Sequence, residues 1–200
     1  FAFNVLKKDK FARVGLIETH RGNINTPAFM PVGTAATVKA VTTPDLKNTG
    51  SEILLGNTYH LMLRPGDDLI KDCGGLHKFM NWDSPILTDS GGYQVYSLSN
   101  LRKLTNDGVE FKSHIDGKKF FITPEKSIEI QRNLNSDIVM CFDECTPFPA
   151  TQDEAKKSML LSMKWAERCK DAFSGSPNQL FGIVQGGVYP ELREESVNSL

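Results

Sequence analysis

Two aspartates each follow a short apolar run in this chain of 200 residues. Asp89 stands between ILT and SGGYQ, and Asp143 stands between IVMCF and ECTP. Two carboxylates at the ends of neighbouring strands can act as general acid and base, or as a base and a substrate anchor. Each aspartate can equally cap the helix that follows it. Taken one at a time, the two residues leave both interpretations open.

The segment DSGGYQ, residues 89–94, strengthens the argument for chemistry. Gly91 and Gly92 have no side chains, so a ligand can approach their backbone closely. The other use of paired glycines is a tight turn, and a tight turn would not need Tyr93 and Gln94 beside it. We therefore favour a ligand site at this point of the chain.

The segment FDECTP suggests which ligand, because a carboxylate such as that of Asp143 accepts two hydrogen bonds at once. Guanine offers adjacent donors on one edge, at N1 and the 2-amino group, and a carboxylate matches them. Gln185 in GIVQGG adds an amide that both donates and accepts. Tyr93 can stack on a base, a contact of about 1–3 kcal/mol. From these residues alone, a purine slot is one of several interpretations.

Composition restricts the class of protein. The chain has 23 basic and 24 acidic residues and a net charge of -1, which provides no overall attraction to nucleic acid or membrane but leaves a local basic patch open. We interpret the group Lys7, Lys8 and Lys10 as solvated surface. No apolar run approaches a membrane span, and the N-terminus lacks a signal peptide's apolar core. We expect a cytoplasmic, reduced protein.

The cysteines and histidines give weaker signals. The four cysteines include no C-x-x-C pair, so neither a disulfide framework nor a closed zinc site is indicated. Alternation with period two would put Cys141 and Cys145 on the same face as Asp143, where we favour two small buried side chains over a metal pair. We interpret His60 as a core histidine and Asp116-Gly117 as a turn.

Short apolar runs rich in Ile, Leu and Val alternate with helical stretches, which predicts an α/β fold with a parallel sheet. Both a barrel and an open doubly wound sheet fit this pattern, and both place active sites at the carboxyl ends of their strands. Four runs end near polar residues, namely Asn57, Asp89, Asp143 and Gln185.

Two long helices have clear start signals. Residues 123–134 are predicted to begin with Thr123 as the cap and proline at the first helical position. Residues 151–173 carry a capping box formed by Thr151 and Glu154, followed by apolar residues at helical spacing.

Hairpins are predicted at 12–27 and at 109–122, the second turning at Asp116-Gly117. A further helix begins at Pro190. A complete barrel takes about 250 residues, so we expect residues 1–200 to be one incomplete domain from the N-terminal part of a longer protein.

Seven segments occur in the same order and spacing as in the tRNA-guanine transglycosylase family, which the chain resembles over nearly its whole length. FDECTPFPA resembles the bacterial branch of that family. The segments are VGTAATVKA (32–40), LGNTYHLMLRPG (55–66), LTDSGGYQV (87–95), FKSHIDG (111–117), TPEKSIEIQ (123–131), FDECTP (142–147) and FGIVQGG (181–187).

The resemblance implies a (β/α)8 barrel, here its N-terminal half to two-thirds with an N-terminal β-hairpin. It implies a pentosyltransferase that exchanges guanine at the wobble position of tRNAs with GUN anticodons. The incoming base is 7-aminomethyl-7-deazaguanine (preQ1), in queuosine biosynthesis. The exchange runs by double displacement through a covalent enzyme-RNA intermediate. The implied partners are tRNA, the two bases and a second copy of the protein.

The resemblance also implies residue roles. Asp89 is the general acid/base, Tyr93 stacks on the base, Asp143 and Gln185 read the purine edge, and Cys145 lies near its discriminating side. A base acted on in this way has to leave its stack. The implied substrate-binding residues are Asp89, Ser90, Gly91, Gly92, Tyr93, Asp143, Cys145, Gln185 and Gly186.

The nucleophilic aspartate, the ligands of a structural zinc and the C-terminal barrel strands are expected beyond residue 200. We therefore expect residues 1–200 to bind no metal and not to catalyse exchange alone.

Two other functions are weighed. The first is a non-catalytic relative that binds a purine or serves as an accessory subunit. The intact segments DSGGYQ, FDEC and IVQGG argue against it, because an accessory chain has no need to keep the pocket. A barrel glycoside hydrolase could use Asp89 and Asp143 as its carboxylate pair. It would not need a carboxylate that matches guanine, so both alternatives rank behind the transglycosylase.

Overall fold

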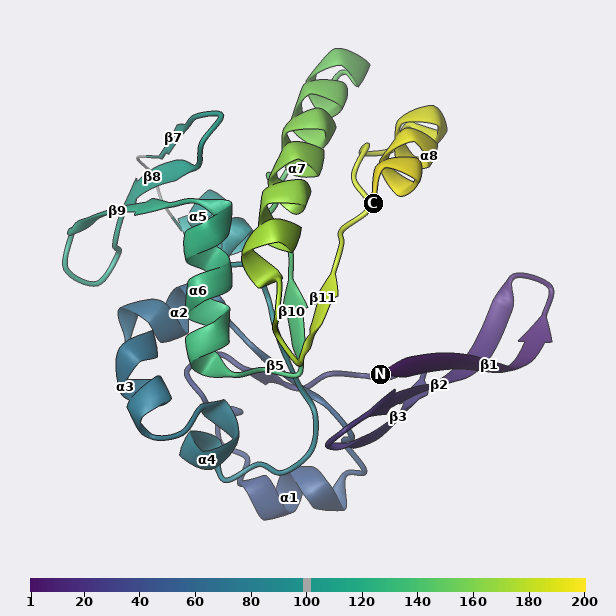
Figure 1. The fold of residues 1–200 in the computed structure, drawn as a ribbon, viewed down its shortest axis with the longest axis vertical. Coiled ribbons are helices and arrows are strands. Elements are labelled where there is room, and N and C mark those ends of the chain that lie inside the picture. The colour runs from purple at the N-terminus through teal and green to yellow at the C-terminus, as the bar shows by residue number, and fades with distance from the viewer. Residues whose placement is uncertain (99–101) are drawn as a thin grey trace.

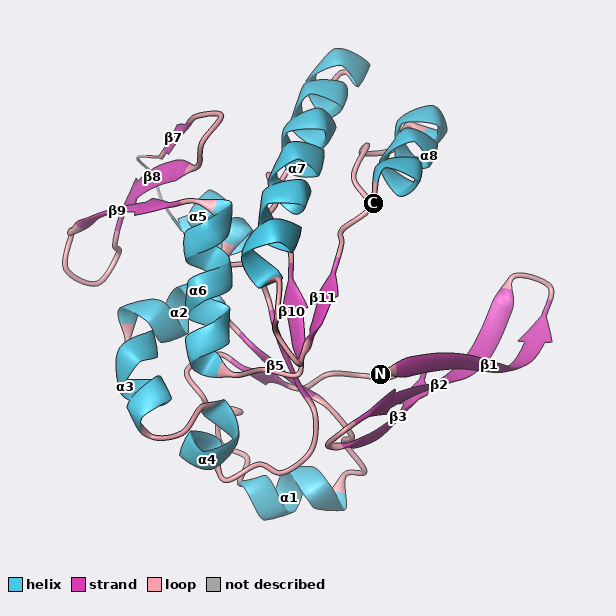
Figure 2. Ribbon diagram, viewed as in Figure 1, coloured by secondary structure: helices cyan, strands magenta, loops and turns pink. Residues whose placement is uncertain are grey.

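A five-stranded parallel sheet forms the centre of the molecule, as the computed structural model shows for residues 1–98 and 102–200 (Figures 1 and 2). The α/β prediction is confirmed. The strands pair in sequence order, without the reversal that marks a doubly wound sheet. They are β4 (Val32–Gly33), β5 (Leu54–Gly56), β6 (Ile86–Thr88), β10 (Ile138–Met140) and β11 (Gln179–Phe181).

The two faces of this sheet pack against different partners. On one face Leu54, Ile86 and Val139 join clusters built mainly from helix residues. On the other face Leu87 and Ile138 pack against residues of the N-terminal strands. The helices are α1 (Thr43–Asn48), α2 (Thr58–Leu63), α3 (Asp67–Asp72), α4 (Leu76–Met80), α5 (Gly92–Leu98), α6 (Pro124–Leu134), α7 (Gln152–Phe173) and α8 (Pro190–Ser199).

Helices α6 and α7 begin as the sequence predicts. The Thr123 hydroxyl accepts a hydrogen bond from the Lys126 amide, and Thr151 and Glu154 form the reciprocal capping box. These bonds satisfy amides that have no partner inside the helix. Within the described chain, no helix combines the length and apolar character that crossing a membrane requires.

Two antiparallel sheets lie on opposite sides of the parallel sheet (Figure 1). Both predicted hairpins are confirmed, and each gains a third strand that the sequence analysis missed. Every residue of the first strand is exposed, and the extra strand of the other sheet has only two residues, so neither carried a burial pattern. The strands are β1 (Ala2–Asp9), β2 (Ala12–Thr19), β3 (Gly22–Thr26), β7 (Lys103–Leu104), β8 (Val109–Lys112) and β9 (Lys119–Ile122).

Two expectations about strand ends are wrong. Strand β11 ends at Phe181, so Gln185 lies in the loop leading to α8 and not at a strand end. Strand β10 ends at Met140, and the chain then bends to stack Phe142 on the Trp165 ring, with 5.0 Å between centroids. Alternation with period two therefore does not continue along the following segment.

The two cysteines of that segment consequently have different surroundings. Cys141 is buried in the core cluster that contains Cys169, whereas Cys145 is half-buried beside Asp143. The preference for a small buried side chain is confirmed for Cys141, and the shared face with Asp143 is not found.

Candidate functional site

Asp89 lies just beyond β6, at the carboxyl end of the parallel sheet. Its carboxylate accepts hydrogen bonds from the backbone amides of Thr58 (2.9 Å) and Gly91 (3.2 Å). The side-chain amides of Asn57 (2.5 Å) and Gln94 (3.1 Å) donate to its other oxygen. Burial raises the pKa of Asp89, and these bonds oppose the rise. A carboxyl group that holds its proton more readily than usual suits general acid/base work.

Asp143 occupies the neighbouring position, beyond β10. The Ser90 hydroxyl donates to one carboxylate oxygen (3.0 Å), and the Gln185 side-chain amide donates to the other (2.8 Å). Burial raises the pKa of Asp143, and the nearby charge of Asp89 adds to the rise. The structure thus brings together the acid and the amide that the sequence proposed for reading a purine edge, and it joins both to Asp89 through Ser90.

Gln185 reaches Asp143 because its loop is tied to α8. The buried hydroxyl of Ser196 accepts a hydrogen bond from the Gln185 backbone amide at 2.9 Å. Gly186 has φ +115, and a Cβ there would lie 2.7 Å from the backbone nitrogen of Arg193. Gly186 therefore lets the chain turn tightly against α8, which holds the amide of Gln185 toward Asp143.

The glycines of DSGGYQ have a structural use of their own. Gly91 adopts φ +82, which disfavours other residues. A Cβ on Gly92 would lie 2.7 Å from the backbone oxygen of Asp143 and 3.2 Å from its carboxylate. The tight turn that the sequence analysis ranked second is therefore present, and Gly92 allows the two carboxylate-bearing segments to approach each other.

A small cavity of about 20 Å³ adjoins Asp143 and Cys145. It has room for about one water molecule and not for a purine. Burial raises the pKa of the Cys145 thiol, and neighbouring Asp143 adds to the rise. Tyr96 and Arg102 complete much of the lining, with the guanidinium carbon 4.0 Å from the Tyr96 ring centroid. Tyr93 instead lies at the surface in the first turn of α5, with 62% of its area exposed.

Sequence reasoning missed the groups that hold Asp89 in place. Asn57 was noted only as a polar strand end, and Gln94 only as part of the glycine segment. Thr58 contributes through its backbone amide, and its hydroxyl donates to the Asp89 backbone oxygen at 2.6 Å. The polar side chains of Asn57 and Gln94 could have been found from the sequence, because they follow or adjoin a strand end. A backbone amide such as that of Thr58 has no sequence signature. Tyr96 and Arg102 were also missed.

His60 is half-buried and belongs to the surroundings of the site rather than to the core where the sequence analysis placed it. Burial lowers its pKa, His114 adds to the lowering, and Asp89 opposes it. His114 also accepts or donates a hydrogen bond with the buried Tyr59 hydroxyl at 3.0 Å. Asp116-Gly117 is part of the β8–β9 turn, as predicted.

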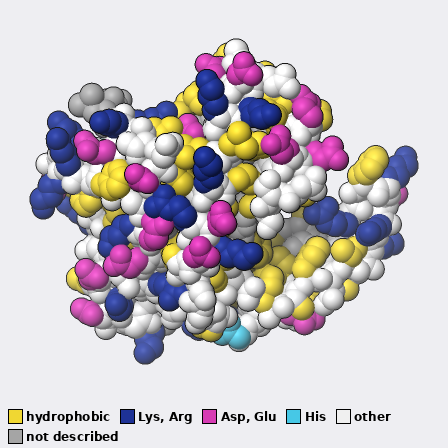
Figure 3. All heavy atoms as spheres, turned by 45° about the horizontal axis from the view of Figure 1, so that its top comes forward, with side chains coloured by type: hydrophobic (Ala, Val, Ile, Leu, Met, Phe, Trp, Pro, Cys, Tyr) yellow, Lys and Arg dark blue, Asp and Glu magenta, His cyan; other side chains and the backbone are white. Residues whose placement is uncertain are grey.

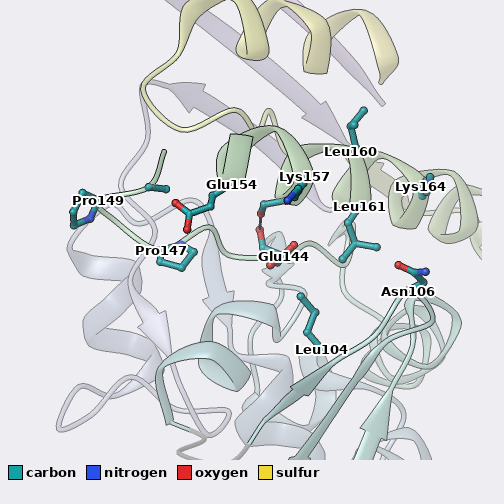
Figure 4. Close-up of a pocket in the computed structure, with 12 residues that line it drawn as sticks. Leu104, Asn106, Glu144, Pro147, Pro149, Glu154, Lys157, Leu160, Leu161 and Lys164 are labelled. Atoms are coloured by element: carbon teal, nitrogen blue, oxygen red, sulfur yellow. Dashed lines mark hydrogen bonds between the residues drawn. The ribbon is translucent and has the colours of Figure 1, made fainter. Parts of the chain in front are cut away.

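A larger groove of about 600 Å³ lies between α7 and β7 (Figure 4). Its described lining includes Glu144, Leu104 and Asn106, but neither Asp89 nor Asp143. Glu144, which follows Asp143 in the sequence, and Leu104 line both the groove and the small cavity beside Asp143. The groove is therefore a neighbour of the carboxylate cluster and not the cluster's own pocket.

The described residues do not bring together side chains that could bind a metal ion. Among residues 1–98 and 102–200, no group of three or more His, Cys, Asp or Glu side chains is placed to hold an ion. Cys141 and Cys169 are in the core, Cys145 is beside Asp143, and Cys73 is exposed. The zinc implied by the resemblance does not fit these residues, and no chemical step passes through it here.

Two carboxylates and an amide at the carboxyl end of a parallel sheet are the arrangement of an α/β enzyme site. Comparison with known proteins identifies the family as that of queuine tRNA-ribosyltransferase. A sequence model of that family matches residues 8–200, and the chain belongs to it. The resemblance drawn from the seven motifs is thereby confirmed.

Individual relatives named queuine tRNA-ribosyltransferase agree with this assignment. The chain is 62% identical over 201 residues to the one from Caldanaerobacter subterraneus subsp. tengcongensis and 62% identical over 201 residues to that of Ruegeria pomeroyi. It is 60% identical over 198 residues to that of Francisella tularensis subsp. novicida. The matches cover 99%, 100% and 99% of this chain but 54% of each relative, so the chain spans about half their length.

Proposed function

We propose that the full-length protein is a tRNA-guanine transglycosylase, a pentosyltransferase that replaces guanine at the wobble position of GUN anticodons by preQ1 during queuosine biosynthesis. Family membership supports the reaction class, and the relatives' names supply tRNA as the substrate whose ribosyl group is transferred. The observation that carries the proposal is the arrangement around Asp143, whose carboxylate is oriented by Gln185 and Ser90 next to Asp89.

We infer that the parallel sheet is one wall of a (β/α)8 barrel. Sequential strand order and helices packed on one face support this inference. Residues 1–200 then form an incomplete barrel domain, and the remaining strands and a zinc-containing subdomain come from the rest of the full-length protein. The carboxylates lie at the carboxyl end of the strands, where barrel enzymes place their chemistry.

In the proposed mechanism, Asp143 accepts the N1 and 2-amino hydrogens of guanine while Gln185 holds the carboxylate in position and contacts the purine edge. Asp89 donates a proton to the departing base and later removes one from the incoming base, which its raised pKa favours. Cys145 adjoins the base, and Tyr93 stacks on it.

Ser90, Gly91, Gly92 and Gly186 supply the backbone around the base. Double displacement also needs a nucleophile at ribose C1′, which the resemblance assigns to an aspartate beyond residue 200. We accordingly propose that residues 1–200 alone do not exchange bases, and that the full-length protein acts as a cytoplasmic homodimer.

The test is exchange of labelled guanine into unmodified tRNA by the protein expressed from the complete reading frame. Asp89→Asn should lower kcat with little change in base affinity. Asp143→Asn should weaken base binding by about 1.5–3 kcal/mol, the value of a hydrogen bond to a charged group. Asp153→Asn, an exposed aspartate at the start of α7, is the matched control and should behave like the parent. A folded parent that exchanges no guanine would overturn the proposal.

A further inference from the structure

The outer face of the β7–β9 sheet is unusually basic for a protein of net charge -1. Burial alternates along β8, so Val109 and Phe111 face the core while Glu110 and Lys112 face outward. We call the exposed side of this sheet the lysine face, and in Figure 3 dark blue side chains gather at the left edge, where Figure 1 places β7–β9. The lysine face consists of Lys103, Glu110, Lys112, Lys119 and Phe121.

The pairing of strands sets two of these lysines against each other. Lys112 is directly opposite Lys119 in the antiparallel register, and both are exposed. Like charges directly opposite each other on one sheet face are destabilising. The single acidic residue of the face, Glu110, is opposite Lys103 on one side and Phe121 on the other. The free protein therefore holds a repulsive pair that an anionic partner would relieve.

Phe121 makes the lysine face suited to a nucleic acid rather than to a simple anion. Its side chain is 49% exposed on the strand that also carries Lys119. Aromatic side chains on a basic sheet surface stack with unpaired bases while lysines contact the phosphates. A polyphosphate chain with splayed bases matches both features of this surface.

The β8–β9 turn connects the lysine face to the candidate active site. The ring of His114, in that turn, stacks on Tyr59 with 5.6 Å between centroids and is hydrogen-bonded to its hydroxyl. Tyr59 follows Thr58, whose backbone amide binds the Asp89 carboxylate at 2.9 Å. The sheet is thus attached, through His114 and Tyr59, to the same helix that positions Asp89.

The N-terminal hairpin offers a built-in comparison. Lys8 is directly opposite Arg13 there, and Lys7 adjoins it, so this hairpin also presents opposed positive charges. It projects on the side of the molecule opposite β7–β9 (Figure 1). Basic charge is therefore common to both sheets, and only the β7–β9 sheet is joined to the site by Tyr59 and His114.

We propose that the lysine face binds the phosphates of the RNA strand next to the base being exchanged, with Phe121 contacting an unpaired base. The proposal rests on the transglycosylase function and specifies where the RNA lies on this chain. It predicts that Lys112 and Lys119 serve RNA binding and contribute nothing to binding of the free base.

The experiment measures binding of a labelled anticodon stem-loop RNA to the full-length protein as salt is raised from about 50 to 200 mM. Lys112→Glu with Lys119→Glu should weaken RNA binding about tenfold or more. It should also reduce the slope of log K against log salt by about 1.4, the value for two single-strand phosphate contacts. Lys7→Glu with Lys8→Glu makes the same charge change on the other exposed sheet and should alter RNA affinity less than about twofold.

Two further measurements separate this proposal from its alternatives. Guanine affinity should be unchanged in both variants, whereas a parent that binds no guanine would contradict the proposed function and not the lysine face. Lys112→Gln with Lys119→Gln should weaken RNA binding while leaving the unfolding midpoint equal or higher, because the repulsion is removed. Equal losses in the two Glu variants would show an effect of net charge alone and would overturn the proposal, as would unchanged RNA binding.

Discussion

Asp137 immediately precedes β10 and is buried, and Asp143 follows the end of the same strand and is half-buried, yet their partners differ in charge. The Asp137 carboxylate lies 3.0 Å from the Arg21 guanidinium and 3.0 Å from the His77 imidazole, and it accepts the Ile86 amide at 2.8 Å. Asp143 receives neutral donors, as does Asp89. The amino end of the sheet thus compensates its buried carboxylate, whereas at the carboxyl end neither Asp89 nor Asp143 forms an ion pair with a cation of residues 1–98 or 102–200.

This difference separates a structural site from a chemical one. A buried charge without a cationic partner is expensive to maintain, and burial accordingly raises the pKa of both Asp89 and Asp143. Asp137 connects the β2–β3 turn, α4 and β6, segments that are far apart in the chain. Stability is therefore concentrated at the amino end, and the capacity to hold or release a proton at the carboxyl end.

The largest effect on stability is expected from Asp137→Asn. The change leaves the buried His77 and the half-buried Arg21 without their carboxylate, so the unfolding free energy should fall by about 2–3 kcal/mol. Urea unfolding at pH 7 measures the change. Asp83→Asn, which removes an exposed carboxylate paired with Lys47, is the control and should leave the unfolding free energy nearly unchanged. If Asp137→Asn lowered the unfolding free energy by less than about 1 kcal/mol, the proposed difference between the amino and carboxyl ends of the parallel sheet would be wrong.

The opposite sign is expected at the carboxyl end. Asp89→Asn with Asp143→Asn removes two half-buried charges while the neighbouring side-chain amides can rotate to keep their hydrogen bonds. The double variant should be more stable than the parent by roughly 0.5–2 kcal/mol at pH 7, the usual gain when a functional site is relieved. Chemical denaturation of the two proteins side by side tests this. A clear loss of stability would mean that these carboxylates are structural, like Asp137.

The pH dependence sharpens the same comparison. Because the pKa of Asp89 and Asp143 is raised on folding, the folded state binds more protons than the unfolded state above the ordinary aspartate value of about 3.9. The contribution of these two groups to the unfolding free energy therefore falls as the pH rises from about 3.9 through the raised pKa values of the folded state. The advantage of the double Asn variant over the parent should be absent near pH 3 and grow as pH increases. An advantage that shrank with rising pH would contradict the assignment.

The smallest effect on stability is expected at Glu125, a carboxylate whose pKa is lowered rather than raised. The Arg168 guanidinium donates two hydrogen bonds to Glu125 and lowers the pKa of that carboxyl to about 2. Its stabilisation is complete above the unfolded glutamate value of about 4.3 and is lost as pH falls through the folded value. Since the pair is partly exposed, Glu125→Gln should lower the unfolding free energy at pH 7 by at most about 1 kcal/mol.

A pH series on this variant and on Glu129→Gln provides the check. Glu129 is on the same helix and forms an exposed ion pair with Lys126 at 3.1 Å, which makes it a matched control. The difference between parent and Glu125→Gln should diminish toward pH 2. A difference that stayed constant into acid would show that the Arg168 pair does not stabilise the folded carboxylate.

Local signals in the sequence were enough for much of the scaffold. Thr123, Thr151 and Glu154 form the caps that their spacing predicts, because a cap involves residues only three positions apart. Strand-end positions also predicted that Asp89 and Asp143 lie together, since parallel strands share one carboxyl edge. Motif order was sufficient for the family.

Tertiary structure alone decided the partners of the buried charges. The sequence around Asp137 does not predict that Arg21 and His77 are its partners. These two residues come from separate elements and meet Asp137 only when the helices and the N-terminal sheet pack on β10. Gln185 reaches Asp143 through a loop tied to α8, and Tyr93 lies at the surface although its motif suggested a pocket. Residue type and spacing determined which groups are available. Long-range packing determined which of them meet, because burial and hydrogen-bond direction depend on elements far apart in the chain.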